Sequence, residues 1–279
     1  MNKKALSILS QEEINALVSG KHEDVFSILG VHHHPDKSGL IIRSFLPTAL
    51  AVDVIDKTSR EKIFSLSMIE PSGLFEGYIE STENSLNYQL EVTYESSELI
   101  IDDPYRFPSL LENDDLYLFG EGTHEQAYRW MGAHSKAIDS VEGTHFVVWA
   151  PDAKRVSVVG DFNFWDGRCH VMRKHPGGGV WDIFIPNVKG DVNYKYEIVS
   201  KFGEVLPLKA DPYAFQMQHA PQNASVTVNK SLYQWQDSEW MEKRSTDIDQ
   251  YHGPVSIYEV HLGSWRRKGG EYNEYLTYR

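Results

Sequence analysis

The chain has 279 residues, 41% hydrophobic and 24% charged, which is typical of a globular protein of about two domains. Its formal net charge of −13 argues against nucleic acid as a partner, because phosphate contacts need a surface rich in Lys and Arg. No apolar run resembles a secretory signal or is long enough to cross a membrane. We therefore expect a cytoplasmic protein with neither nucleic acid nor membrane as its partner.

The sequence suggests no metal or cofactor site. The single cysteine, Cys169, can form no disulfide within the chain and has no Cys or His partner at metal-ligand spacing. His32, His33 and His34 are consecutive, and consecutive residues rarely direct three ligands to one ion, so we interpret them as a polar loop. We expect no metal and no cofactor.

The first predicted element is a short helix over residues 11–19. Ser10 and Glu13 have the spacing of a capping box, in which two side chains satisfy the first free backbone N–H groups, and Gly20 stands where such a helix ends. From Gly39 onward the chain changes to short β-rich runs separated by Pro, Gly, Ser and Asn. This pattern is typical of a β-sandwich.

The β-rich pattern occurs twice. Residues 39–47 (Gly-Leu-Ile-Ile-Arg-Ser-Phe-Leu-Pro) are matched by residues 143–151 (Gly-Thr-His-Phe-Val-Val-Trp-Ala-Pro). Further matches follow at similar spacing: residues 73–79 with 179–185, 87–88 with 193–194, and 103–105 with 211–213. Loops accept insertions more readily than strands, so two copies of one fold would give such nearly constant offsets. The repeat therefore indicates two immunoglobulin-like β-sandwiches in tandem.

The resulting division of the chain has five parts. They are an N-terminal helix (1–20), a first sandwich (21–110), a linker with a short helix (111–137), a second sandwich (138–230), and a connector that opens a further domain (231–279). In the linker, residues 112–115 predict an acidic loop, and a second capping box at Thr123 and Gln126 predicts a helix through Trp130. The β-rich run at 255–261 predicts the first strand of the last part.

Three segments together resemble bacterial glycogen branching enzymes: residues 160–166 (Gly-Asp-Phe-Asn-Phe-Trp-Asp), 194–198 (Tyr-Lys-Tyr-Glu-Ile) and 257–265 (Ile-Tyr-Glu-Val-His-Leu-Gly-Ser-Trp). The first two resemble the family-48 carbohydrate-binding module, and the third resembles the first strand of the (β/α)8 barrel of the α-amylase superfamily. Residues 22–32 resemble the additional N-terminal domain of the longer bacterial enzymes. The resemblance implies a mainly β fold, with two tandem sandwiches followed by the first strand of a truncated barrel.

The resemblance also implies a parent enzyme that cleaves α-1,4 glucan and re-attaches the chain by an α-1,6 linkage in glycogen biosynthesis, acting as a monomer. Such a barrel needs about 250 residues and carries its catalytic groups at the ends of several strands. Only 26 residues run from Pro254 to Arg279, and Glu259 would lie on the first strand rather than at a catalytic position. We expect no catalytic residue in this chain and no activity from it alone.

The candidate substrate-binding residues are Trp165, Lys195 and Asn163. The resemblance implies that Trp165 and Lys195 contact α-glucan. A flat indole face can stack on a glucose ring, and Lys195 and Asn163 can donate hydrogen bonds to hydroxyl groups. The alternative for Trp165 is a position in the core or between domains, and for Trp181, within an alternating strand, we predict the core. The second aromatic of the best glycogen binders has no counterpart, since Val205 stands near its place, and weak binding is expected.

Two other classes of protein fit part of this pattern. A stand-alone glycogen-binding module would share the second sandwich but would have no use for a barrel strand at 257–265. The front of a debranching or trehalose-releasing enzyme would share both, but the additional N-terminal sandwich and the Leu-Gly-Ser-Trp ending at 262–265 favour a branching enzyme.

Overall fold

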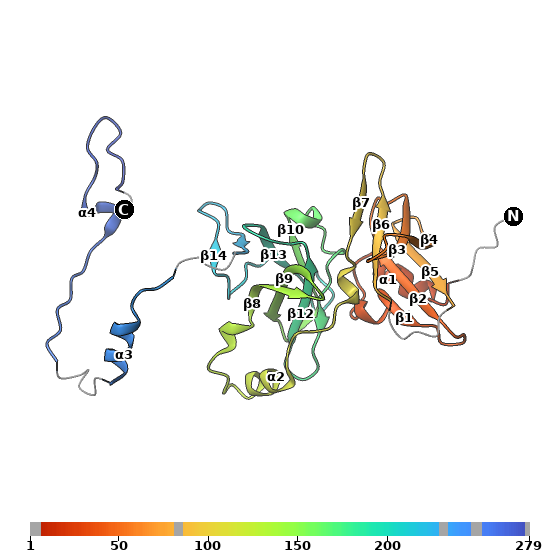
Figure 1. Ribbon diagram of the computed structural model, residues 1–279, viewed down its shortest axis with the longest axis horizontal. Helices are drawn as coiled ribbons and strands as arrows, with labels where there is room; N and C mark the ends of the chain where they lie inside the picture. Colours follow the sequence, from red (N-terminus) through yellow and green to blue (C-terminus); the bar gives the residue numbers. More distant parts are fainter. Residues whose placement is uncertain (1–6, 81–85, 229–233, 247–252, 277–279) are drawn as a thin grey trace. The chain divides into compact units, whose positions relative to one another are not determined.

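The computed structural model describes residues 7–80, 86–228, 234–246 and 253–276. The chain divides into two units, residues 1–230 and 231–279. Within the described residues of the first unit, the strands form three antiparallel sheets, joined by a few short helices (Figure 1). The fold is therefore mainly β, as the sequence predicts.

The first lobe is built on a seven-stranded sheet in the order β1-β2-β5-β4-β3-β6-β7. Its strands are β1 (Gly30–His33), β2 (Leu40–Phe45), β3 (Ala51–Asp56), β4 (Lys62–Glu70), β5 (Leu74–Ile79), β6 (Tyr88–Thr93) and β7 (Glu98–Ile101). Strand β4 pairs with β3 through its first half and with β5 through its second half, where the register shifts between Met68 and Glu70. Such an irregularity bends a strand. The two arms of the sheet accordingly share one buried cluster, which includes Ile42, Val54 and Leu90.

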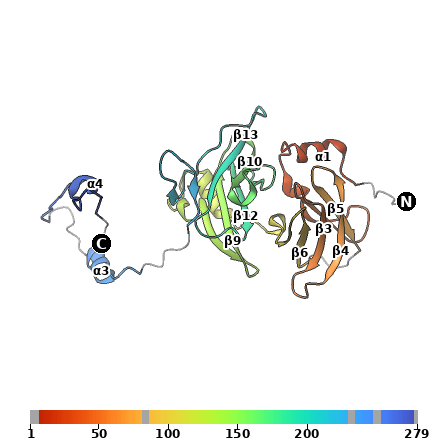
Figure 2. The ribbon, with the colours of Figure 1, turned by 90° about the horizontal axis from the view of Figure 1, so that it is seen from above.

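The second lobe is a pair of four-stranded sheets, β10-β13-β15-β14 and β11-β12-β9-β8 (Figure 2). Their strands are β8 (Gly132–Ile138), β9 (Val141–Trp149), β10 (Ala153–Gly160), β11 (Arg173–Lys174), β12 (Val180–Pro186), β13 (Asn193–Ser200), β14 (Gln216–Met217) and β15 (Ser225–Val226). Both sheets contribute to one buried cluster, with Phe146 and Trp181 from one and Val158 and Tyr196 from the other. Trp181 is fully buried, which confirms its predicted place in the core.

The predicted repeat corresponds to matching structural positions in the two lobes. Strand β2 pairs with β5 as β9 pairs with β12, and the matched segments 39–47 and 143–151 supply β2 and β9. The same side-chain bond also recurs. Tyr88 donates its hydroxyl to Asp103 at 2.7 Å, and Tyr194 donates its hydroxyl to Asp211 at 2.7 Å. Both tyrosines are fully buried, so each bond satisfies polar groups inside its lobe.

The helices are short and agree only partly with prediction. They are α1 (Gln11–Val18), α2 (Asn113–Gly120), α3 (Ser238–Thr246) and α4 (Leu262–Trp265), with 3₁₀ turns η1 (Val25–Ser27), η2 (Pro104–Arg106), η3 (Ala127–Arg129) and η4 (Asp161–Asn163). Helix α1 is confirmed, and both bonds of its capping box form between Ser10 and Glu13. The predicted helix from Thr123 to Trp130 is wrong, because only the turn η3 forms there without a side-chain cap. The predicted acidic loop instead opens α2, whose first turn carries two acidic residues facing the positive helix end.

The polar-loop interpretation of the three histidines is also wrong in part. His32 and His33 lie in strand β1, which pairs with β2 in register from Gly30 to His33. The ring of His32 bonds the carbonyl of Leu29 at 2.9 Å. The β2 edge supplies a ladder of backbone partners that composition alone does not reveal.

Residues 107–131, the end of the first predicted sandwich and most of the linker, cover the outer face of the sheet β11-β12-β9-β8. Phe107 packs edge-on against Phe184 with ring centroids 4.9 Å apart, and Met131 joins Val147 in a separate buried cluster. Asp182 points to this covered side, is 1% exposed, and accepts hydrogen bonds from residues of three segments. Its partners are Ser109 at 2.9 Å and His145 and His175 at 2.8 Å each. The linker therefore leaves the outer face of the other sheet, β10-β13-β15-β14, uncovered. On that face the outward residues of β10 are buried, whereas Asn193 and Lys195 of β13 stay partly exposed, so β13 supplies its available surface.

The two lobes are fastened to each other at a junction within residues 1–230. The hydroxyl of Tyr105 donates to the carbonyl of Cys169 at 3.0 Å and accepts from the backbone N–H of Val171 at 3.1 Å. The guanidinium of Arg173 lies 4.0 Å from the ring centre of Phe26. Helix α1 adds Ile14 to the same buried cluster that fills the second lobe. Hydrogen bonds between the Tyr105 side chain and the backbone, a cation–π contact and a shared apolar cluster therefore fix the two lobes against each other.

The first barrel strand, predicted at 255–261 in the second unit, is not formed. Residues 254–261 are not in a β-strand, and Ile257 and Tyr258 are 88% and 73% exposed. A β-strand is stabilised by hydrogen bonds to a neighbouring strand, and among the described residues none pairs with this segment. Across the part of the chain that the structure describes, no helix is long and apolar enough to span a membrane.

Candidate functional site

The residues that follow β10 form a loop, residues 161–170, which we call the aromatic loop. The strand ends at Gly160, where a Cβ atom would collide with the carbonyl oxygen of Asn193 on β13, so only glycine fits. Phe164 and Trp165 then adopt left-handed backbone conformations, with φ of +54° and +61°. Such conformations cost about 1–3 kcal/mol each in non-glycine residues and are concentrated at functional sites.

Trp165 is half-buried and its indole edge is fixed by a carboxylate. Its Nε1–H donates to one oxygen of Asp161 at 3.1 Å, and the side chain of Asn193 donates to the other oxygen at 3.0 Å. The tryptophan is thus neither a core residue like Trp181 nor a free surface side chain. Its ring is held beside the outer face of β13.

Lys195 lies on that outer face. Its neighbours Tyr194 and Tyr196 are fully buried, so the alternation of β13 directs Lys195 and Asn193 outward together. The ammonium of Lys195 donates to the side-chain oxygen of Asn223 at 2.5 Å. Trp165 and Lys195 are therefore brought to one face through Asp161 and Asn193, as a site for a hydroxyl-rich ligand requires.

Asn163 has a different place from the other two candidates. It is 5% exposed, and its Oδ1 accepts the backbone N–H of Gly160 at 2.9 Å. Its amide nitrogen donates to the carbonyl of Val158 and to Nδ1 of His170, both at 2.9 Å. Both amide hydrogens are used inside the protein, so Asn163 positions the aromatic loop.

The sequence did not point to Asp161, Asn193 or Asn223. For Asn193, the signal was present, because the period of two in β13 places it with Lys195. For Asn223, which lies 28 positions from Lys195, no local pattern could have shown the contact. An exposed aromatic, Phe202, also follows β13 at the turn, three positions before Val205.

The imidazole of His170 gives the loop a pH dependence. Burial lowers its pKa from 6.5 to about 4, so folding favours the neutral ring. The unfolded chain binds more protons between these values, and stability is complete above about pH 6.5 and lost as pH falls toward 4. We expect the His170→Gln variant to lose about 1–2 kcal/mol less unfolding free energy than the parent chain between pH 7 and pH 5, measured by urea titration at each pH. If the variant and the parent chain lost the same unfolding free energy between pH 7 and pH 5, His170 would not be the source of this pH dependence.

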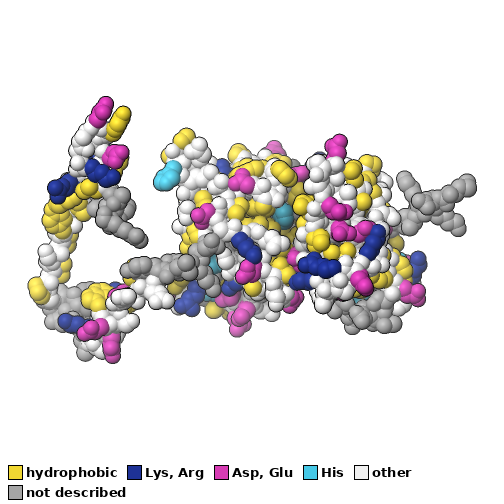
Figure 3. All heavy atoms as spheres, turned by 45° about the horizontal axis from the view of Figure 1, so that its top comes forward, with side chains coloured by type: hydrophobic (Ala, Val, Ile, Leu, Met, Phe, Trp, Pro, Cys, Tyr) yellow, Lys and Arg dark blue, Asp and Glu magenta, His cyan; other side chains and the backbone are white. Residues whose placement is uncertain are grey.

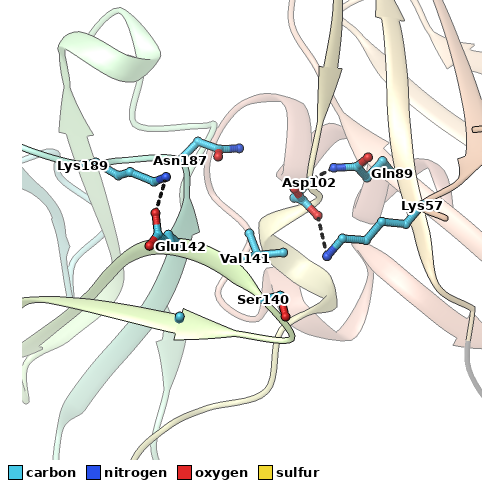
Figure 4. A pocket seen from close by; sticks show the side chains of 9 residues that line it. Lys57, Gln89, Asp102, Ser140, Val141, Glu142, Asn187 and Lys189 are labelled. Carbon is cyan, nitrogen blue, oxygen red and sulfur yellow. Dashed lines mark hydrogen bonds and ion pairs between the residues drawn. The ribbon is translucent and has the colours of Figure 1, made fainter.

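A polar hollow of about 410 Å³ lies at the junction of the lobes (Figure 4). Lys189 is paired with Glu142 at 2.6 Å, and Lys57 lies 3.8 Å from Asp102. The described lining contains no aromatic side chain, and these four charges are paired with one another. The hollow therefore offers no stacking face comparable to Trp165.

Comparison with protein families matches two separate parts of the chain. Residues 10–105 match the N-terminal domain of alpha-1,4-glucan branching enzyme GlgB, and residues 130–214 match carbohydrate-binding module 48, also described as the isoamylase N-terminal domain. The chain is 48% identical over 265 residues to the 1,4-alpha-glucan branching enzyme GlgB of Shewanella sp. (strain W3-18-1). The chain corresponds to the N-terminal portion of bacterial 1,4-alpha-glucan branching enzymes, with the GlgB N-terminal domain followed by carbohydrate-binding module 48. The predicted family is thereby confirmed.

The match covers 95% of this chain but 35% of the Shewanella branching enzyme. A second relative, the GlgB of Saccharophagus degradans, is 46% identical over 97% of this chain and 37% of its own length. The chain thus spans about a third of the branching enzymes that it resembles. A solved pullulanase complexed with maltotetraose, from Anoxybacillus sp. LM18-11, is 16% identical over 72% of this chain and 26% of its own, with a TM-score of 0.32.

The aromatic loop and the residues Asn193 and Lys195 all lie within the segment that matches carbohydrate-binding module 48. The sheet β11-β12-β9-β8 and the residues that cover its outer face lie on the opposite side of the second lobe. The open sheet of this branching-enzyme portion is therefore its candidate sugar-binding face.

Proposed function

We propose that this chain is the glucan-binding and packing portion of a 1,4-α-glucan branching enzyme, and that its second lobe binds α-glucan. The observation that carries the proposal is the strained aromatic loop, which holds Trp165 beside the outward row of Asn193 and Lys195. An aromatic face with a few placed donors and acceptors suits a sugar ring, whose faces are apolar and whose edges carry hydroxyl groups. The cytoplasmic location remains a prediction.

Each candidate residue has a distinct proposed role. The indole of Trp165 stacks on a glucose ring, and the ammonium of Lys195 donates to a hydroxyl group while Asn223 holds it in place. Asn163 acts through the backbone of the aromatic loop, because both of its amide hydrogens are already donated within the protein. The two lobes are proposed to be tandem immunoglobulin-like sandwiches. The first is the one predicted at 21–110, and the second, predicted at 138–230, begins instead with β8 (Gly132–Ile138), which shortens the predicted linker of 111–137 to 111–131.

The activity of the whole enzyme is part of the proposal. A carboxylate nucleophile would attack C1 at the cleaved α-1,4 bond, so that one part of the glucan becomes a covalent glucosyl-enzyme and the other part leaves through its 4-oxygen. A second carboxyl group would first protonate that leaving oxygen and then deprotonate the accepting 6-hydroxyl. The α-1,6 bond forms as the enzyme–glucose bond breaks, which regenerates the nucleophile. We assign none of these groups to the present chain, and Glu259, in the segment 254–261 without a strand, is given no part in them.

The binding role is tested by electrophoresis of the full chain through gels with and without glycogen. We expect glycogen to retard the chain, with excess maltoheptaose restoring its mobility, since the sugar competes for the same face. A mobility that glycogen leaves unchanged would contradict the proposal.

The full chain alone is expected to show no branching activity. Branching shortens the linear segments of amylose and lowers the absorbance of its iodine complex, so this absorbance should stay constant during incubation. Enzyme from a branching-enzyme relative, added to the same amylose, is the positive control. A steady fall of absorbance with the chain alone would overturn the assignment.

A further inference from the structure

A second hollow, larger and less polar, lies at the junction between the two lobes. Its volume is about 730 Å³, within the range of about 300–1,000 Å³ usual for small-molecule sites. The first lobe supplies Tyr94 and Leu99 from the β6–β7 hairpin, and the second supplies Phe164 and His170 from the aromatic loop. Asp102 and Asn187 line both this groove and the polar hollow of Figure 4, so the two adjoin. We call the larger one the junction groove.

The junction groove is preformed. Tyr105, which lines it, ties the lobes together through its two bonds to the backbone of residues 169 and 171. The guanidinium of Arg168 lies 5.6 Å from the ring centre of Phe45 across the junction, and it donates to the carbonyl of Val18 at 3.4 Å. A ligand that enters such a site pays little for ordering it. Hydrophobic side chains also reach the surface on both lobes beside the junction (Figure 3).

Phe164 is the residue that most clearly indicates that the junction groove binds a ligand. It is 94% exposed although it is large and apolar, and it has a left-handed backbone. Burial would be favourable for such a side chain, and the backbone conformation is costly, so neither packing nor local preference explains it. It stands next to Trp165 in the sequence, but it lines the junction groove, whereas Trp165 is tied to the face of β13.

The charged groups of the groove argue against an anionic ligand. Arg168 is bonded to Asp166, with a shortest separation of 2.6 Å, and Asp102 is bonded to Arg106 at 3.0 Å. Asp103, which burial places at a pKa of about 6, accepts from Tyr88 and Tyr105. The described lining thus holds three carboxylates and one guanidinium, which opposes an anion such as phosphate.

His170 adds a donor for a neutral ligand. Asn163 donates to its Nδ1, so the neutral ring carries its hydrogen on Nε2. Aromatic and aliphatic faces combined with neutral donors and amide groups are the chemistry that recognises a sugar.

We propose that the junction groove is a second α-glucan site, in which a glucose ring stacks on Phe164 while the first lobe closes the other wall. This inference rests on the proposed function, since it extends the same ligand to a second place. The aromatic loop would then separate two sites, and one branched glucan that occupied both would gain avidity without new contacts.

The test is an NMR titration of the full ¹⁵N-labelled chain with maltoheptaose. Two groups of backbone amides should shift, one around Asn193 and Lys195 and one within residues 94–101. Phe164→Ala should abolish the shifts within 94–101 and keep the others, whereas Trp165→Ala should do the reverse. Phe215→Ala, which also removes an exposed phenylalanine but lies outside the groove, is the matched control and should keep both groups.

Leu99→Arg gives an independent variant from the opposite wall, and it should also abolish the shifts within 94–101. The inference is overturned if those amides do not shift in the parent chain, or if Phe164→Ala leaves their shifts unchanged. It is equally overturned if an apolar dye shifts them and maltoheptaose does not, since the groove would then be an apolar docking face. If maltoheptaose shifts the amides within 94–101 of the parent chain but not those around Asn193 and Lys195, the proposed binding face is wrong and this inference stands.

Discussion

Trp165→Ala is expected to weaken glycogen binding about 30-fold, which corresponds to about 2 kcal/mol for the loss of a central aromatic contact. The indole is fixed at its edge by Asp161, so its face is already oriented for a sugar ring and little freedom is lost on binding. The dissociation constant follows from mobility in gels of increasing glycogen concentration. The thermal midpoint should change little, because Trp165 is only half-buried.

Trp149→Ala is the matched control for this variant. Trp149 is 54% exposed, lies on β9 in the other sheet, and donates its Nε1–H to a backbone carbonyl at 2.9 Å. Its loss should leave glycogen mobility unchanged. If Trp149→Ala and Trp165→Ala reduced retention equally, the binding face would not be the open sheet.

Asp182→Ala is expected to lower the unfolding free energy by about 3–5 kcal/mol. The substitution removes the carboxylate that Ser109, His145 and His175 share, and it leaves these groups without their hydrogen-bond acceptor. Burial alone would raise the pKa of Asp182, but hydrogen bonds from His145 and His175 outweigh it and hold the pKa below its ordinary 3.8. Folding therefore favours the ionised form. This contribution to stability is complete above about pH 4 and is lost as pH falls below it. Urea unfolding at pH 7 measures the loss.

Glu142→Ala is the control for Asp182→Ala. Glu142 is bonded to Lys189 at 2.6 Å, but its side chain is 67% exposed, and exposed pairs contribute about 0–1 kcal/mol. The two carboxylates thus differ in burial rather than in bond length. Equal losses for both variants would show that the buried hydrogen bonds of Asp182 do not stabilise the second lobe.

The repeat could be predicted from the sequence because the signals that mark its strands and turns are local. Glycines, prolines and alternating apolar residues recur at nearly fixed offsets, and each marks a strand or a turn regardless of what lies elsewhere. The pairing of β2 with β5 and of β9 with β12 follows from that repeat. The core position of Trp181 and the capping box of α1 were predictable for the same reason.

The sequence could not predict features that depend on distant partners. Asn163 was expected to face a sugar, yet its amide is used by Val158, Gly160 and His170. The segment 255–261 has the composition of a strand, but a strand forms only beside another one. The junction groove brings the β6–β7 hairpin to residues more than 60 positions later, and no sequence pattern encodes that contact.

A crystal structure of the full chain soaked with maltoheptaose would show directly whether the outer face of β13 binds α-glucan. We expect a glucose ring stacked on the indole of Trp165, with one of its hydroxyl groups within hydrogen-bond distance of the Lys195 ammonium. Sugar bound only on surfaces away from both residues, with the outer face of β13 empty at saturating maltoheptaose, would contradict it.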